Sequence, residues 1–289
     1  MYEKWKGVHT RCAFNMIQEL IPLTRPRTLA AALGPTILGA AFSYYAFGAV
    51  QGTGLAIFHT ILIFLAVVTA QIVANLWNEY KDFKSGLDAG QKIGNAGSIT
   101  RGAITPELII TMIKVLMFVP IIIGLYLSAT ITWYYIPIGF LCILISFLYS
   151  GGPKPISRTP FGEISSGIAM GFAIVLITGY AWIRELSLAL LIPAIPSTLL
   201  VGSIMLTNNI RDIRNDESHG RHTLPIVLGR ERALSLMSIS YIFNFIWIIA
   251  WIIIGHMTWF ALLAFLAAPL AFKTIHTLST NTDEFQLDK

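Results

Sequence analysis

The first of two acid-rich clusters in this sequence follows a long apolar run. Within fourteen residues it holds two amides and three carboxylates, namely Asn75, Asn78, Glu79, Asp82 and Asp88. If the apolar helix continues into this cluster, Gln71, Asn75, Asn78 or Glu79, and Asp82 share one helical face, because residues three or four positions apart are neighbours on a helix. The pattern therefore predicts a ladder of oxygen donors along one helix.

The second acid-rich cluster closes another apolar run far downstream. Asn208, Asp212 and Asp216 fall at i, i+4 and i+8, which again places them on one helical face. Two such ladders suit Mg²⁺, which takes oxygen ligands and completes its octahedral shell with water or phosphate. His and Cys are absent from both ladders, which disfavours zinc. We expect the two ladders to face each other and to hold magnesium ions and a diphosphate.

Basic side chains accompany both clusters. They are Lys81, Lys84, Arg101, Arg211, Arg214 and Arg221. Any one of them could neutralise a neighbouring acid on a solvated loop or could bind a phosphate oxygen. Acids at the edge of a membrane bundle are costly unless they have partners, and two matched ladders favour a functional site. Metal ions and cations together would neutralise a diphosphate leaving group as its C–O bond breaks.

The composition identifies the elements that must position these clusters as membrane-spanning helices. The chain has 289 residues, of which 55% are hydrophobic and only 12% are charged, and its mean hydropathy is +0.69. Soluble domains average about 25% charged residues. The apolar runs are about twenty residues long, the length of a helix that crosses a bilayer, and short alternating segments typical of a barrel are absent. The predicted fold is an all-α, polytopic helix bundle.

Eight spans are expected, and they organise the chain into three parts. Residues 1–27 form an N-terminal segment at the membrane interface or in the cytoplasm, residues 28–275 form the transmembrane domain, and residues 276–289 form a polar tail. The spans lie at about 28–50, 55–77, 107–128, 131–149, 163–183, 188–207, 233–255 and 258–275. Gly167 and Gly171 in the fifth span would let two helices approach closely.

The distribution of basic residues predicts which side of the membrane the clusters face. The loops after spans one, three, five and seven carry a single Lys or Arg, Arg184, whereas most others lie in the N-terminal segment and the remaining loops. The positive-inside rule then puts the N-terminus and both acid clusters in the cytoplasm. The net charge of +5 is explained by this bias and does not indicate nucleic acid. The N-terminus lacks a compact apolar signal-peptide core, and the two cysteines do not indicate a disulfide framework.

At both acid clusters the sequence resembles the UbiA superfamily of intramembrane aromatic prenyltransferases. The first motif, Asn78-Glu79-x2-Asp82-x5-Asp88, is similar to that of the branch acting on 1,4-dihydroxy-2-naphthoate in menaquinone biosynthesis. The second motif, Asn208-Asn209-Ile-Arg211-Asp212-x3-Asp216, also looks like that branch. So do Tyr149-Ser-Gly-Gly-Pro153 and Thr159-Pro160-Phe161-Gly162-Glu163. The resemblance covers roughly residues 20–275.

The resemblance implies a magnesium-dependent transferase, a multi-pass protein of the cell membrane. It would ionise a polyprenyl diphosphate so that the ring of 1,4-dihydroxy-2-naphthoate attacks the allylic cation, with loss of carbon dioxide and diphosphate. Asp82 and Asp212 would be catalytic, and Tyr149 either stabilises the cation or belongs to the interfacial aromatic belt. The residues expected to bind substrate are Asn75, Arg101, Lys154, Arg211 and Arg221. Those expected to hold Mg²⁺, directly or through water, are Asn78, Glu79, Asp82, Asp88, Asp212 and Asp216.

Alternative functions remain open at this point. The family usually has nine spans and eight are expected here, which leaves open a truncated chain, a divergent member, a member of reduced activity or a catalytically dead scaffold. Another aromatic ring, such as hydroxybenzoate, could be the acceptor. A cation-coupled transporter would also use acids in a membrane, but transporter sites usually lie near the bilayer midplane. Here the acids gather at one membrane face, which favours the transferase. The donor's chain length and the oligomeric state are not predicted.

Overall fold

The protein is described by a computed structural model that covers residues 19–86 and 97–281. In these residues the regular structure is entirely helical, which confirms the predicted all-α class. The described chain divides into two compact units: unit 1 takes residues up to Leu33 and Ile61–Pro155, and unit 2 takes Gly34–Thr60 and residues from Ile156 onward. Helices α2 (Ala30–Phe47) and α3 (Thr53–Ser85) contribute residues to both units.

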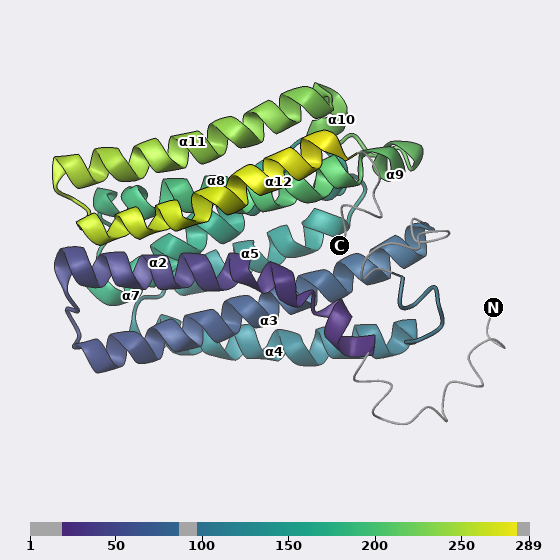
Figure 1. Ribbon diagram of the computed structural model, residues 1–289. Coiled ribbons are helices and arrows are strands. Elements are labelled where there is room, and N and C mark those ends of the chain that lie inside the picture. The colour runs from purple at the N-terminus through teal and green to yellow at the C-terminus, as the bar shows by residue number, and fades with distance from the viewer. Residues whose placement is uncertain (1–18, 87–96, 282–289) are drawn as a thin grey trace. The chain divides into compact units, whose positions relative to one another are not determined.

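Unit 1 is built on α3 from Ile61 onward, together with α4 (Pro106–Thr130) and α5 (Tyr135–Ser150). Its core joins Val73 and Leu76 of α3 to Ile109 of α4, and these helices lie side by side in Figure 1. Ile99 and Ile104, from the segment between the helices, are buried in the same core. The core therefore fixes that segment against the end of α3 that carries the first acid motif.

The fifth expected span is interrupted in unit 2. It consists of α6 (Gly162–Ser166), a π-helical segment η5 (Gly167–Phe172) and α7 (Ala173–Ile183). This span packs along α8 (Leu191–Arg211). A Cβ on Gly167 would lie 2.6 Å from the Thr198 carbonyl oxygen, and one on Gly171 would lie 2.6 Å from the Ser197 carbonyl oxygen. The expected close approach at these two glycines is therefore confirmed.

The C-terminal part of unit 2 surrounds the end of α8. Short helices α9 (Ile213–Ser218) and α10 (Leu224–Leu228) lead into α11 (Arg230–Ile254), and the 3₁₀ segment η7 (Trp259–Ala267) leads into α12 (Ala268–Thr280). Helices α11 and α12 lie alongside α8 (Figure 1). Leu206 and Ile210 of α8 are buried with Met237 of α11 and Leu278 of α12. This cluster holds three helices together at the second acid motif.

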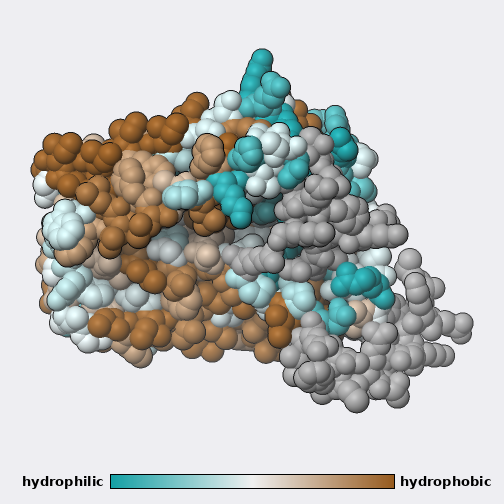
Figure 2. Space-filling view, in the orientation of Figure 1, coloured by the Kyte–Doolittle hydropathy of each residue, from teal (hydrophilic) through white to brown (hydrophobic). Residues whose placement is uncertain are grey.

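The helices carry large apolar side chains on their exposed surfaces, as expected for contact with lipid. On α11, Ile239, Ile242, Ile246, Ile249 and Ile253 recur at intervals of three and four, and all are exposed. Figure 2 shows hydrophobic side chains along α11 and hydrophilic ones near α9 and α10. In the described residues seven helices are long and apolar enough to span a membrane, and the shorter apolar helix α5 corresponds to the fourth of the eight expected spans. The protein is therefore a multi-pass membrane protein.

Candidate active site

The first acid motif continues the α3 helix, as its spacing predicted. Residues from Gln71 to Asp82 lie within one unbroken helix that ends at Ser85. Two amides of this ladder hold the chain before α2: Gln71 Nε2 donates to the Thr28 carbonyl oxygen at 2.7 Å, and Asn75 Nδ2 donates to the Thr24 carbonyl oxygen at 3.0 Å. The amide nitrogen of Asn75 therefore binds backbone.

The two carboxylates of the first motif that the structure describes are protected from solvent. Glu79 is 2% exposed and Asp82 is 9% exposed, whereas Asn78 is half-buried. The Ile99 backbone N–H donates to Glu79 Oε1 at 3.4 Å. Arg101, two residues further on, donates to Ser98 Oγ at 3.2 Å and pairs with Glu19 at 3.5 Å. The segment between α3 and α4 thus brings a backbone N–H group to the acid ladder and orders an exposed guanidinium on its own surface.

Another side of α3 anchors the ladder to α5. Trp77 Nε1 donates to the Phe147 carbonyl oxygen at 3.0 Å, and the two rings pack edge to face with centroids 5.2 Å apart. Lys81 Nζ lies 5.4 Å from the centroid of the Trp77 ring. Tyr149 is half-buried in the last turn of α5, and Lys154 is exposed in the loop that follows. The contacts between Trp77 and Phe147 fix the rotation of α3 about its own axis, and with it the direction in which the acids point.

The second acid motif departs from the single helix predicted by its spacing. Helix α8 ends at Arg211, Asp212 has φ −93° and ψ 10°, and α9 begins at Ile213. Arg211 makes a two-pronged ion pair with Asp212, with Nε–Oδ1 and Nη2–Oδ2 distances of 2.6 and 2.8 Å. Adjacent side chains do not face each other on a helix. The break lets the neighbouring Arg211 and Asp212 side chains pair, while the Asp216 N–H still donates to the Asp212 carbonyl oxygen.

Asp216 is the most deeply buried acid of the second motif. It is 2% exposed, and the guanidinium of Arg221 lies 3.2 Å from its carboxylate oxygen Oδ1. The Arg221 N–H also donates to the Asp216 carbonyl oxygen at 3.0 Å, which folds the chain after α9 back on itself. Each acid of the second motif is therefore held by an arginine, because a buried carboxylate needs a compensating charge.

Glu163 adjoins the second motif and was not among the predicted site residues. It is 4% exposed in α6, and its Oε1 accepts a 2.7 Å hydrogen bond from Asn209 Nδ2. Its other carboxylate oxygen is buried without a hydrogen-bond partner in the described part of the chain. Acid residues are rare inside membrane bundles and usually functional. The sequence feature that could have identified Glu163 is its position, because it is an acid at the start of an apolar run.

The donor set of the two motifs fits Mg²⁺, because every predicted ligand is a carboxylate or an amide oxygen donor. The first motif lies in unit 1 and the second in unit 2. Among the described residues no three His, Cys, Asp or Glu side chains gather as a metal cluster. Asp88 lies outside the described residues. The prediction that the motifs share a metal site remains a prediction, and the chemistry of their side chains is consistent with it.

Solved structures show the same fold. The apo structure of a UbiA homolog from Aeropyrum pernix K1 has a TM-score of 0.69 and 20% identity, covering 91% of this chain and 92% of that one. A UbiA homolog from Archaeoglobus fulgidus, solved bound to DMAPP and Mg²⁺, has a TM-score of 0.60 and 16% identity, with 91% and 85% coverage. At these identities the likeness concerns the fold alone.

Sequence relatives are closer. The chain is 37% identical over 268 residues to the 1,4-dihydroxy-2-naphthoate octaprenyltransferase of Bacillus subtilis (strain 168), a match that covers 90% of this chain and 82% of that protein. The enzyme of the same name from Haemophilus influenzae is 29% identical, with 90% and 86% coverage. The model of the UbiA prenyltransferase family matches residues 32–286. This chain therefore belongs to the UbiA prenyltransferase family.

Proposed function

We propose that this protein transfers a polyprenyl group from polyprenyl diphosphate to 1,4-dihydroxy-2-naphthoate, with loss of diphosphate and carbon dioxide. The reaction would serve menaquinone biosynthesis. The observation that carries the proposal is the 37% identity to the Bacillus subtilis enzyme of that name over 90% of the chain. The two acid motifs support it, since both lie where apolar helices end and both hold buried carboxylates.

The first motif would receive the diphosphate end of the donor. Mg²⁺, when bound, would neutralise the diphosphate as its C–O bond breaks. The ligands would come from Asn78, Glu79, Asp82, Asp88, Asp212 and Asp216, directly or through water. Arg101, Lys154 and Arg211 would bind diphosphate or the acceptor's carboxylate, because guanidinium and ammonium groups pair with such anions. Asn75, whose amide nitrogen holds Thr24, would position the ladder at the substrate.

The acceptor ring would attack the allylic carbon after the C–O bond breaks. The bonding electrons leave with the diphosphate, and the ring then loses carbon dioxide. Tyr149, at the end of α5, offers an aromatic face that would stabilise the allylic cation. Arg221 would hold the buried Asp216 carboxylate in place while substrate binds. The positive-inside distribution supports a cytoplasmic face for the N-terminus and both motifs.

Prenyl transfer by the purified protein tests this proposal. The assay contains labelled polyprenyl diphosphate, 1,4-dihydroxy-2-naphthoate and Mg²⁺ in detergent or lipid, and the product sought is the prenylated, decarboxylated quinol. We expect product that disappears when a chelator removes the metal. Product only with hydroxybenzoate would reassign the acceptor, and ion uptake into vesicles without any prenylated product would support a transporter instead.

A further inference from the structure

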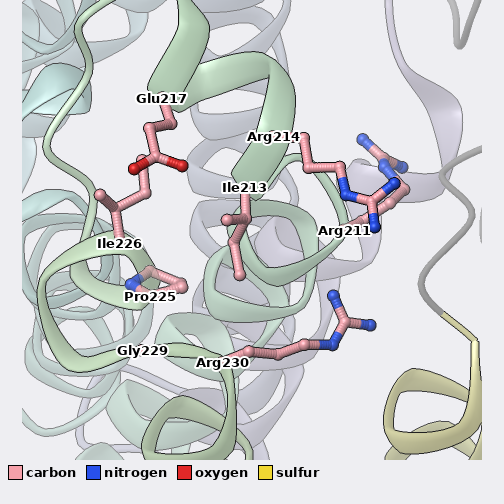
Figure 3. A pocket seen from close by; sticks show the side chains of 8 residues that line it. All are labelled: Arg211, Ile213, Arg214, Glu217, Pro225, Ile226, Gly229 and Arg230. Carbon is pink, nitrogen blue, oxygen red and sulfur yellow. The ribbon is translucent and has the colours of Figure 1, made fainter.

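A small pocket beside the second acid motif is lined by three arginines. Its volume is about 210 Å³, and Arg211, Arg214 and Arg230 line it together with Glu217, Ile226 and Gly229. Figure 3 shows the guanidinium groups of the three arginines gathered on one side of the pocket. The Glu217 carboxylate lies on the other side, near Ile226. The arginine pocket, defined by Arg211, Arg214 and Arg230, is therefore positive where these side chains converge.

The arginine pocket adjoins the second acid motif at Arg211, which pairs with Asp212. Arg214 lies two positions before Asp216 in α9, so at about 100° per residue it points nearly opposite to that acid. Arg214 therefore points away from a carboxylate that we assign to the metal, whereas Arg211 contacts one.

Arg230 is held rigidly at the base of the pocket. Its Nη1 donates to the Ile210 carbonyl oxygen at 3.2 Å, and its Nη2 donates to the carbonyl oxygens of Leu278 and Asn281 at 2.7 and 2.6 Å. These contacts join the ends of α8 and α12 to the start of α11. A guanidinium fixed by backbone oxygens loses little further rotamer freedom when an anion arrives, which favours binding.

One of the three pocket arginines, Arg211, is paired with an acid, Asp212, and in the described part of the chain the other two are not. Neither Arg214 nor Arg230 forms an ion pair with an acid among the described residues. Guanidinium groups held close together repel one another, and an anion between them relieves that repulsion. Arginine presents paired N–H groups that match the oxygens of a phosphate. The pocket is smaller than the roughly 300 Å³ at which ligand sites usually begin, so a single phosphate group suits it better than an isoprenoid or an aromatic ring.

We propose that Arg214 and Arg230 bind a phosphate group without a metal ion, in the pocket that adjoins the second acid motif at Arg211. The phosphate could belong to a free anion or to the headgroup of an anionic lipid, because α9 and α10 lie at a polar end of apolar helices. Both sources present the same oxygens to Arg214 and Arg230. Their difference is that only the lipid is delivered from the membrane.

Thermal unfolding of the purified protein tests this site, because a ligand that binds the folded state raises Tm. Measurements are made with a chelator present, which prevents a magnesium–diphosphate complex. One arm adds inorganic phosphate at constant ionic strength set with chloride, and the other adds phosphatidylglycerol to detergent micelles. Arg214→Gln removes one positive charge from the pocket. Arg214→Lys keeps the charge but lacks the paired N–H groups of the guanidinium. The matched control is Arg232→Gln, an exposed arginine that does not line the pocket.

We expect the anion that raises the Tm of the unaltered chain to bind the Arg214→Gln variant about tenfold more weakly, because one charge-assisted contact is lost. Arg214→Lys should bind with intermediate affinity, and Arg232→Gln should match the unaltered chain. Stabilisation by inorganic phosphate identifies a free anion, and stabilisation by phosphatidylglycerol alone identifies a lipid headgroup. The proposal is overturned if neither probe raises Tm, or if Arg214→Gln and Arg232→Gln respond alike.

Discussion

Asp212 is the most accessible carboxylate of the second motif, since 29% of its side chain is exposed while Arg211 grips both of its oxygens. If it acts on the metal and the diphosphate, Asp212→Asn should lower kcat by about a hundredfold or more, because the amide cannot supply the negative charge. Asp82→Asn should behave in the same way. Turnover and thermal unfolding are measured on each purified variant.

Glu231→Gln serves as the control for these two substitutions. Glu231 is an exposed acid in the first turn of α11 and lies outside both motifs, so the same chemical change should leave turnover nearly intact. Normal kcat in Asp82→Asn or Asp212→Asn would remove that residue from the metal site. A large fall in the Tm of either variant would point to a structural role instead.

The Glu163–Asn209 hydrogen bond supports a second prediction at the scale of single residues. Asn209→Ala removes the donor from a buried carboxylate oxygen, so it should destabilise the protein by about 1–3 kcal/mol. In a Glu163→Gln background the same substitution should cost less, because no buried charge is left without a partner. The free energies of unfolding of the unaltered chain, the two single variants and the double variant complete a double-mutant cycle. Equal losses in both backgrounds would show that the pair is not coupled.

At the scale of helices, the contact between η5 and α8 depends on Gly171. A Cβ there would lie 2.6 Å from both the Ser197 carbonyl oxygen and Thr198 Cα, and neither backbone atom can move away freely. Gly171→Ala should therefore destabilise the protein by about 1–3 kcal/mol. Gly124→Ala in α4 is the control, since a Cβ there meets nothing within 4 Å. It should leave Tm unchanged or raise it, because alanine favours helix.

Hydropathy and spacing predicted the long helices but not their interruptions. The apolar run before Asn75 and the four-residue spacing after it were sufficient to extend α3 through Asp82. The break at Asp212 depends on an ion pair between adjacent side chains, which periodicity does not report. The π-helical turn at Gly167–Phe172 inserts extra residues per turn without any change in hydropathy. Packing against neighbouring helices therefore decides which residues of an interrupted span face those neighbours.

For the whole molecule, the distribution of basic residues predicts membrane topology. A reporter fused after Arg184 should be external, and one fused after Lys92 should be cytoplasmic, because the loops containing most lysines and arginines stay inside. Labelling of the two fusions in intact and permeabilised cells distinguishes the sides. A protected reporter at Arg184 together with an accessible one at Lys92 would invert the proposed position of the site.

The candidate site was predictable where its residues share a sequence pattern and unpredictable where distant segments meet. Asp82, Asp212 and Asp216 were predicted because their spacing repeats every turn. Glu163 and Arg230 were not, since Glu163 reaches Asn209 across 46 positions and Arg230 reaches Leu278 across 48. Such contacts follow from tertiary packing of unit 2, and a single sequence carries no record of that packing.

The arginines that hold Asp212 and Asp216 also act as resident counter-ions. A divalent cation that binds Asp212 would have to replace the guanidinium of Arg211, which holds both carboxylate oxygens, so binding there would be an exchange and not a simple addition. The released guanidinium would then be free to meet the anion that arrives with the metal. In this arrangement Asp212 and Asp216 would face a positive charge whether or not a metal is bound.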